Sequence, residues 1–260
     1  MSVIIPVSHT SVLERFSALR SQKRKGFAVL IDPDKTNVEN VQSLVDNAHR
    51  LAISFFFVGG SLLMDDNMRE IIKAIKAISD IPVVLFPGSI QQVVSEADAI
   101  FFLSLISGRN ADLLIGSHVL AAPMLKKSKL EVMPTGYILI ESGKTTTVHY
   151  ISNTQPIPSD KPDIAACTAM AGEMLGLKVL YMDGGSGAMY PVPPAVIKAV
   201  STYTQIPLIV GGGIRTKEQA LLAWKAGADV IVVGNALEQA DGEALLESIS
   251  EAMHQYNAQS

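Results

Sequence analysis

Three stretches decide the fold: residues 179–187, VLYMDGGSG; residues 207–214, PLIVGGGI; and residues 230–235, VIVVGN. Each is a short apolar run that ends in glycine, and segments of helical period lie between them. Runs that are apolar throughout, rather than alternating, are typical of parallel strands buried on both faces. The three stretches therefore predict consecutive strands of a parallel sheet covered by helices, each followed by a glycine-containing loop.

Five further apolar runs precede these three along the chain. They are FAVLID from Phe27, ISFFFV from Ile53, PVVLF from Pro82, AIFFLSL from Ala99 and YILIE from Tyr137. Eight alternations of strand and helix predict a closed (β/α)8 barrel, in which residues 1–260 form one domain and residues 1–26 are an N-terminal extension. An open doubly wound sheet is the alternative, but no GxGxxG follows the first strand.

Local signals support helices between the strands. Thr36 with Glu39 and Thr216 with Gln219 have the spacing of a capping box, in which two side chains satisfy the first free N–H groups of a helix. In the extension, residues 12, 16 and 19 are apolar and share one helical face. We expect an extra helix there, packed on the barrel.

Composition excludes several classes of protein. Of the 260 residues, 48% are apolar and 18% charged, so the chain can bury a full core. The net charge of −4 leaves no basic footprint for nucleic acid. The single cysteine, Cys167, excludes an intrachain disulfide, and no apolar segment approaches the roughly 18 residues of a membrane helix. A soluble, cytoplasmic protein without a transmembrane segment is expected.

In a barrel, the reactive groups lie at the carboxyl ends of the strands. Glycines follow three consecutive strands, in the loops 184–187, 211–213 and 234–235. Glycine lets successive N–H groups turn toward one point, and the helices that follow add partial positive charge. The loops predict a phosphate site, although glycines also occur where a tight strand-to-helix turn is the only requirement.

The end of the first strand carries acids. Asp32 and Asp34 are two residues apart, so on extended chain both face the barrel mouth, where oxygen ligands suit Mg²⁺. Ser61, at the end of the second strand, adds a hydroxyl next to them. Asp-Pro-Asp is also ordinary turn chemistry, and this reading is stronger for Asp34 than for Asp32.

Cations and aromatic residues complete the list of candidates. Only Lys35, Arg109, Lys144 and Arg215 are close to strand ends, too few to neutralise a phosphate and a diphosphate without a divalent metal. Phenylalanines at 55–57, 86 and 101–102 offer a surface for a long apolar substrate, yet aromatic residues in buried strands are usually plain core.

Taken together, the strand-end motifs resemble the geranylgeranylglyceryl phosphate synthase family. The resemblance covers residues 27–235 and rests on five motifs in the same order on the same strands. They are IDPDK at 31–35, VGGS at 58–61, YMDGGSG at 181–187, VGGGI at 210–214 and VGN at 233–235. Two positions depart from the family pattern: Asp183 stands where Glu is frequent, and Leu30 where some members have Lys.

The resemblance implies a prenyltransferase that joins sn-glycerol 1-phosphate to geranylgeranyl or a similar long polyprenyl diphosphate, with Mg²⁺ as cofactor. It implies Asp32 and Ser61 as metal ligands, Asp183 as the residue that orients the glycerol hydroxyl and accepts its proton, and a homo-oligomer, a dimer or a hexamer. The substrate-binding residues that it implies are Tyr181, Met182, Asp183, Gly184, Gly185, Ser186, Gly187, Gly212, Gly213, Gly234 and Asn235.

Two other functions remain open at this point. A phosphosugar isomerase or lyase, or an enzyme of the thiamine phosphate synthase type, shares the phosphate loops but needs no apolar groove. A non-catalytic protein that binds a phosphorylated ligand is the second alternative, because a fold alone does not prove chemistry.

Overall fold

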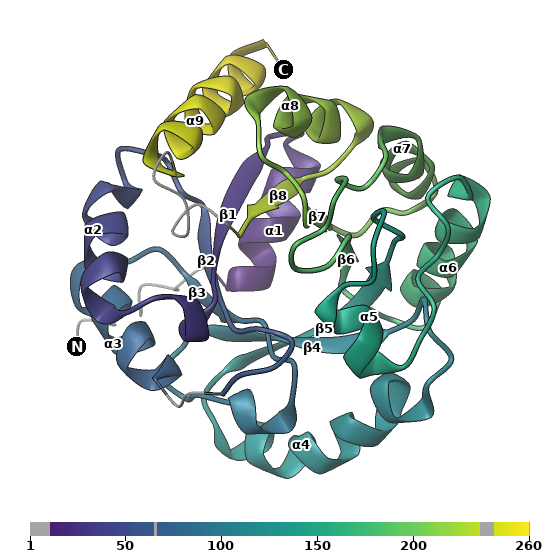
Figure 1. Cartoon of the computed structure of the whole chain (residues 1–260), viewed down its shortest axis with the longest axis horizontal. Helices are drawn as coiled ribbons and strands as arrows, with labels where there is room; N and C mark the ends of the chain where they lie inside the picture. The colour runs from purple at the N-terminus through teal and green to yellow at the C-terminus, as the bar shows by residue number, and fades with distance from the viewer. Residues whose placement is uncertain (1–10, 65–66, 235–241, 260) are drawn as a thin grey trace, which may run out of the picture.

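The computed structural model describes residues 11–64, 67–234 and 242–259. Eight parallel strands form a closed barrel in the order in which they occur along the chain (Figure 1). The strands are β1 (Gly26–Ile31), β2 (Phe55–Val58), β3 (Val83–Leu85), β4 (Ala99–Leu105), β5 (Glu131–Leu139), β6 (Val179–Asp183), β7 (Leu208–Gly211) and β8 (Val230–Val233). The predicted barrel is confirmed, and the open sheet is excluded.

Helices surround the barrel. The longer ones are α2 (Val38–Ala48), α3 (Met68–Ile78), α4 (Ser117–Lys127), α6 (Pro162–Met174), α7 (Pro194–Tyr203), α8 (Lys217–Ala226) and α9 (Gly242–Gln259). A π-helical segment, η3 (Asp112–Gly116), precedes α4, and the short helix α5 (Thr147–Ser152) lies between β5 and α6. These two elements occupy the longest connections between strands, both on the same side of the barrel (Figure 1).

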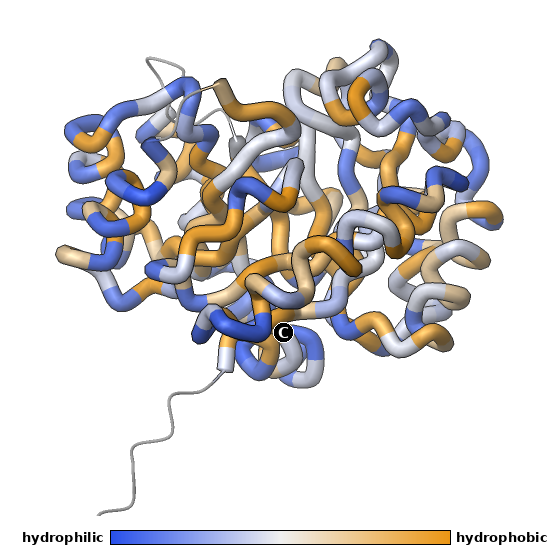
Figure 2. Tube along the Cα trace, turned by 90° about the horizontal axis from the view of Figure 1, so that it is seen from below, coloured by the Kyte–Doolittle hydropathy of each residue, from blue (hydrophilic) through white to orange (hydrophobic). Residues whose placement is uncertain are grey.

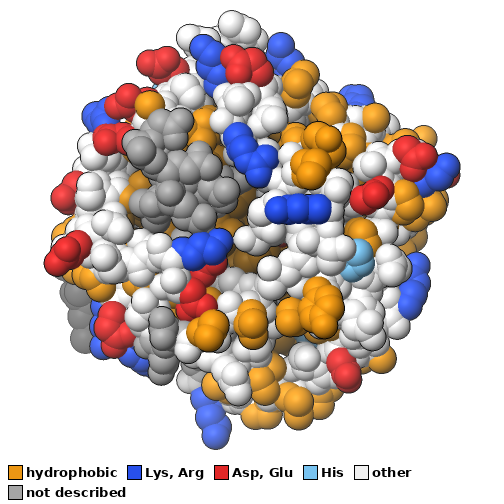
Figure 3. Space-filling view, in the orientation of Figure 1, with side chains coloured by type: hydrophobic (Ala, Val, Ile, Leu, Met, Phe, Trp, Pro, Cys, Tyr) orange, Lys and Arg blue, Asp and Glu red, His pale blue; other side chains and the backbone are white. Residues whose placement is uncertain are grey.

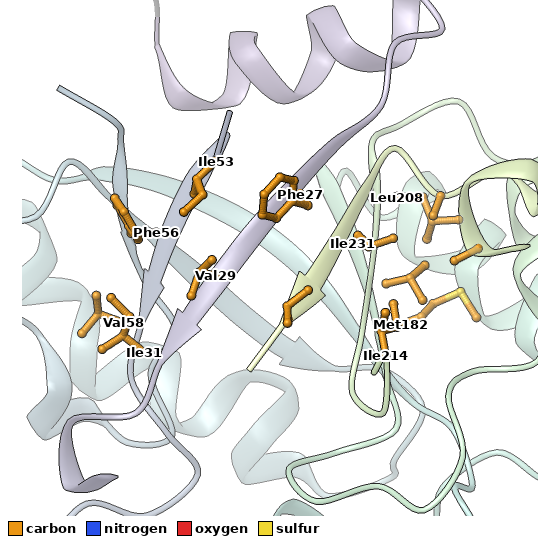
Figure 4. Packing of buried hydrophobic residues seen from close by; sticks show 14 of the residues in the cluster. Phe27, Val29, Ile31, Ile53, Phe56, Val58, Met182, Leu208, Ile214 and Ile231 are labelled. Carbon is orange, nitrogen blue, oxygen red and sulfur yellow. The ribbon is translucent and has the colours of Figure 1, made fainter. Parts of the chain in front are cut away.

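Two apolar layers hold the barrel together, because the strands are buried on both faces except at the start of β5. Outward side chains pack against the helices, as Val29, Phe56 and Ile231 do (Figure 4). Inward side chains, such as Phe57, Phe101 and Tyr181, fill the barrel. Figure 2 shows the same arrangement as apolar chain inside and polar chain on the outer helices. The barrel interior is therefore a packed core, and chemistry is confined to its mouth.

The helix α1 (Val12–Ser21) closes the amino-terminal end of the barrel, as expected from its apolar face. The ring of Phe16 stacks on Phe55 at 4.2 Å between centroids. Glu131 at the start of β5 accepts hydrogen bonds from the N–H groups of Val12, at 2.6 Å, and Leu13, at 3.0 Å. A carboxylate at a helix N-terminus is stabilising, so α1 is fixed as a plug.

Some predicted boundaries were wrong. The strand expected from Tyr137 begins at Glu131, before Pro134 and Gly136. The capping box at Thr36 and Glu39 is not formed, because α2 is capped by Asn37, whose side chain accepts from the N–H of Asn40.

Only one of the two hydrogen bonds expected for the second capping box is formed. Thr216 caps α8 and accepts from the N–H of Gln219, but the Gln219 side chain accepts from the N–H of Arg215. In the described ranges, no helix combines the length and the apolarity that a bilayer crossing requires.

Candidate active site

Asp32 lies at the barrel mouth, directly after β1. It continues the inward-facing positions Ala28 and Leu30 of that strand, since alternate residues share a face. One carboxylate oxygen accepts from the N–H of Asp34 at 3.2 Å, and the other is 3.4 Å from the ammonium of Lys35. The Asp32 side chain is 24% exposed, so it is available to a ligand in the mouth.

Asp34 has a different task. Its carboxylate accepts from the N–H of Met64, at 2.8 Å, in the loop that follows β2. The Asn67 side chain donates to the carbonyl of Pro33 at 2.9 Å, and so joins the same two loops. This contact matches the turn reading of Asp34 and leaves Asp32 as the carboxylate that faces the mouth.

The surroundings of Asp32 fit a magnesium ion. A Cβ on Gly60 would be 3.3 Å from the Leu63 side chain and 3.5 Å from the Asp32 carboxylate, so this glycine brings the loop after β2 close to that carboxylate, and Ser61 follows directly. In the described part of the chain, no group of three or more His, Cys, Asp or Glu side chains is placed to hold a metal. One carboxylate and one hydroxyl suit Mg²⁺, which keeps several waters and binds substrate phosphates.

The glycine loops after β6 and β7 form a cradle of backbone donors across the mouth. Gly185, Gly187, Gly212 and Gly213 have positive φ angles of 86°, 73°, 74° and 78°. Among the described residues, the N–H groups of residues 186, 187, 212 and 213 meet no acceptor. Free N–H groups at successive turns make an anion-binding concavity.

The two loops pack so closely that side chains are excluded. A Cβ on Gly212 would be 2.7 Å from the Asp183 carboxylate, and one on Gly213 would be 2.9 Å from the backbone of Pro191. Gly234 follows β8, and a Cβ there would be no nearer than 3.8 Å to Leu30. Asn235, the last of the predicted phosphate residues, lies outside the described residues.

Asp183 is buried at the end of β6, with 7% of its surface exposed. The Tyr137 hydroxyl donates to one carboxylate oxygen at 2.5 Å, and the N–H of Gly185 donates to the other at 2.8 Å. Burial raises the pKa of Asp183 above its ordinary value, although both hydrogen bonds act in the opposite direction. A carboxylate with a raised pKa is a better proton acceptor than an exposed one.

The neighbours of Asp183 on β6 point to opposite sides of the barrel wall. Tyr181 faces inward below the mouth, and its hydroxyl is 2.8 Å from the position of a Cβ on Gly211. The buried Met182 packs outward in the layer between strands and helices (Figure 4). Its side chain does not reach the mouth, so any contact of Met182 with substrate is through its backbone.

The four candidate cations have different surroundings. Lys35 pairs with Asp32. Arg109 donates to carbonyls of residues 106–108, and Arg215 to the carbonyls of Ala188 and Met189. Lys144 lies over the glycine loop, with its ammonium 3.5 Å from the position of a Cβ on Gly187. Figure 3 shows a hollow near the centre of this face with basic and acidic side chains beside it.

An apolar groove, which no sequence motif indicates, leads away from Gly60 and Ser61 toward α4. Its apolar walls include Phe86, Phe101, Phe102, Leu113, Leu125 and Val148. Phe55, Phe56 and Phe57 are plain core, as expected, whereas three of the other phenylalanines also border the groove. The leucines that follow Asn110 are the only sequence signal, and they resemble an ordinary helix.

His118 is the histidine among the residues that line the groove. The buried ring of His118 packs edge-on against Phe102 and lies 3.2 Å from the Ser104 hydroxyl through Nε2. Burial lowers the pKa of His118. A neutral imidazole adds no charge to the groove, which therefore suits an uncharged, apolar chain.

Tyr137→Phe tests the hydrogen bond to Asp183. The Tyr137 hydroxyl favours the ionised carboxylate, so its removal raises the pKa of Asp183 further. If Asp183 acts as a base, the acidic limb of the profile of kcat/KM against pH moves to higher pH, and activity at neutral pH falls about tenfold. An unchanged acidic limb would show that Asp183 is not the group whose ionisation this limb reports.

Gly212→Ala tests the cradle. The new methyl group would collide with the Asp183 carboxylate, and we expect the Kd for glycerol phosphate to rise at least about a hundredfold. Gly176→Ala is the matched control, because Gly176 has a φ of 92° but nothing within 4 Å of the added carbon. The control should lower the Tm slightly and leave the Kd unchanged. If Gly212→Ala and Gly176→Ala raised the Kd equally, backbone strain would explain both effects, which would contradict the role of the cradle.

The fold and this site define a (β/α)8-barrel protein with a candidate phosphate cradle after β6 and β7, and with Asp32 and Ser61 after β1 and β2. A family model described as "PcrB family" matches residues 19–253. The chain is 52% identical over 246 residues to the geranylgeranylglyceryl phosphate synthase of Chitinophaga pinensis, covering 95% of this chain and 97% of that protein. The chain therefore belongs to the PcrB and geranylgeranylglyceryl phosphate synthase family.

Solved structures agree. The geranylgeranylglyceryl phosphate synthase of Thermoplasma acidophilum, in complex with its substrate sn-glycerol-1-phosphate, superposes with a TM-score of 0.87 at 35% identity, covering 94% of this chain and 99% of that chain. A thiamine phosphate pyrophosphorylase of Pyrococcus furiosus reaches a TM-score of 0.56 at 15% identity, covering 91% and 98%. That second likeness shows the barrel fold alone.

Proposed function

We propose that this protein is a Mg²⁺-dependent prenyltransferase that joins sn-glycerol 1-phosphate to geranylgeranyl diphosphate or a similar long polyprenyl diphosphate. One observation carries the proposal: Gly60 and Ser61 border both the Asp32 site and the apolar groove, and the phosphate cradle faces them across the same mouth. An amphiphilic diphosphate with a long hydrocarbon tail has the shape and polarity of that path. The relatives named above bear the corresponding enzyme name.

The cradle after β6 and β7 would hold the phosphate of glycerol phosphate through the free N–H groups of residues 186, 187, 212 and 213. Asp183, which lies beneath this loop, would then orient the free hydroxyl. The hydroxyl oxygen forms a bond to the allylic carbon while the carbon–oxygen bond to diphosphate breaks, and the hydroxyl proton passes to Asp183. Burial, which raises the pKa of Asp183, favours that transfer.

Asp32 and Ser61 are the residues that would hold Mg²⁺. When bound, the ion neutralises the charge of the diphosphate leaving group. Lys35, which already pairs with Asp32, adds a positive charge at the same place. The groove binds the tail and keeps water away from the allylic carbon, which limits hydrolysis. Binding both substrates in one orientation supplies most of the remaining rate enhancement.

The direct test is incubation of the protein with sn-glycerol 1-phosphate, Mg²⁺ and labelled prenyl diphosphates of several chain lengths. A labelled product that extracts into organic solvent is expected, and it should require both substrates. No extractable product at any chain length would reject the proposal and favour a phosphosugar isomerase or lyase, an enzyme of the thiamine phosphate synthase type, or a phosphoryl-ligand binder. The oligomeric state and the cytoplasmic location stay predictions of the sequence.

A further inference from the structure

Gln92 is a buried amide beside the proposed metal site. It ends the 3₁₀ helix η2 (Ile90–Gln92) after β3, and 6% of its surface is exposed. Burial of a polar side chain is unfavourable unless its hydrogen bonds are satisfied. The partners of this amide therefore indicate why it lies in the interior.

Both ends of the Gln92 amide are engaged. Its Nε2 donates to the carbonyl of Gly60 at 3.0 Å, and its Oε1 accepts from the N–H of Gly88 at 3.0 Å. A single side chain thus joins the loop after β2 to the loop after β3. Only a group that is donor at one end and acceptor at the other makes both contacts, which an amide does and a carboxylate or an alkyl chain does not.

The loops that Gln92 joins are in direct contact. A Cβ on Gly59 would be 2.2 Å from the carbonyl of Phe86, and a Cβ on Gly88 would be 2.4 Å from the carbonyl of Gly60 and 2.6 Å from that of Ser61. On its other side, Gly60 faces the Asp32 carboxylate. The backbone of Gly60 and Ser61 is therefore held between Asp32 and Gly88, and the Gln92 amide is the hydrogen-bonding link that fixes it.

We propose that Gln92 is a positioning residue that sets the place of Ser61 relative to Asp32, and thereby the affinity of the site for a divalent cation with diphosphate. The inference rests on the proposed function, because it takes Asp32 and Ser61 as the ligands. Gln92 does not itself touch substrate. Gln92 acts through the loop after β2, because it binds the Gly60 carbonyl next to Ser61. A displacement of about 1 Å of a residue that ligates a metal weakens the metal site.

Gln92→Met tests the inference, because methionine has a similar length but cannot make the hydrogen bonds to Gly60 and Gly88. Binding of Mn²⁺ in the presence of inorganic diphosphate, measured by electron paramagnetic resonance without turnover, should weaken at least about tenfold. The Mg²⁺ concentration for half-maximal activity should rise in parallel, while saturating Mg²⁺ restores kcat to within about threefold of the unaltered protein. A purely structural role would not be reversed by Mg²⁺.

Gln91→Met is the matched control, because Gln91 is the exposed neighbour on the same 3₁₀ helix. It should bind Mn²⁺ as the unaltered protein does. Gln92→Asn, an amide too short to span both loops, should resemble Gln92→Met. Binding of glycerol phosphate, measured by calorimetry, reports on the intact barrel and should be unchanged in all three variants.

Two results would overturn the inference. One is unchanged Mn²⁺ binding in both Gln92 variants. The other is parallel loss of Mn²⁺ and glycerol phosphate binding, which would make Gln92 a residue for general folding. Failure of the proposed function would give a different result. The unaltered protein would form no prenylated product, even if it bound Mn²⁺ and the Gln92 variants bound Mn²⁺ more weakly.

Discussion

Asp32→Asn is expected to lower kcat/KM by about a thousandfold, the largest effect of any single change in the mouth. The amide retains the size of the side chain and accepts from the N–H of Asp34 as the carboxylate does. It removes the negative charge that pairs with Lys35 and that is proposed to bind the metal. Steady-state kinetics should show the loss, and calorimetry should show that glycerol phosphate still binds.

Asp34→Asn is the matched control, because it is the same change two residues along. Its new amide oxygen accepts from the N–H of Met64, so the loop stays fixed. Activity within about tenfold of the unaltered protein is expected, because no charge that faces the mouth is lost. Equal losses in the two variants would contradict the assignment of the metal to Asp32.

Asp183→Asn is expected to lower kcat/KM by at least about a hundredfold, because it removes the group proposed to orient the hydroxyl and accept its proton. The same change should raise the Tm at neutral pH by a few degrees. Burial raises the pKa of Asp183, so the folded state binds its proton more tightly than the unfolded state does. The free energy of unfolding therefore falls as the pH rises from the ordinary range of aspartate through the raised pKa, and asparagine avoids this loss.

The buried Asp229 provides the contrasting control. Its carboxylate pairs with Arg20 at 3.1 Å and Lys25 at 3.4 Å near α1, away from the mouth. Asp229→Asn should lower the Tm, because it weakens two ion pairs in the interior, and should leave kcat/KM close to its original value. Full activity in Asp183→Asn would contradict the proposed role of Asp183, whereas a fall in its Tm would contradict only the raised pKa.

The fold was predictable because its signals are local. Most strands of the barrel are short, apolar and bounded by turn residues, and strand order in this barrel follows sequence order. The start of β5 was missed because Pro134 and Gly136 resemble a loop, although both lie within the strand. Pairing of this part of β5 with the whole of β4 overrides those conformational preferences.

The site was predictable where chemistry follows a strand directly. Asp32, Ser61 and the glycine loops are all at strand ends, so their place at the mouth follows from the topology. The residues that orient these groups were not predictable from the sequence. The distance from Tyr137 to Asp183 or from Gln92 to Gly60 along the chain is too long for any local pattern to indicate the contact.

The groove was missed for a related reason. It is lined by β4, the loop after β3, α4 and α5, and none of these elements is distinctive alone. Phe102, in particular, occupies a strand position where an aromatic residue is ordinary core.

The most direct test of the account is a crystal structure of the protein with sn-glycerol 1-phosphate, Mn²⁺ and diphosphate. The phosphate of glycerol phosphate should lie within hydrogen-bonding distance of the N–H groups of residues 186, 187, 212 and 213, with its free hydroxyl toward Asp183. Anomalous scattering should place Mn²⁺ beside Asp32 and Ser61, across the mouth. A phosphate bound elsewhere, or a metal remote from Asp32, would contradict the central claim.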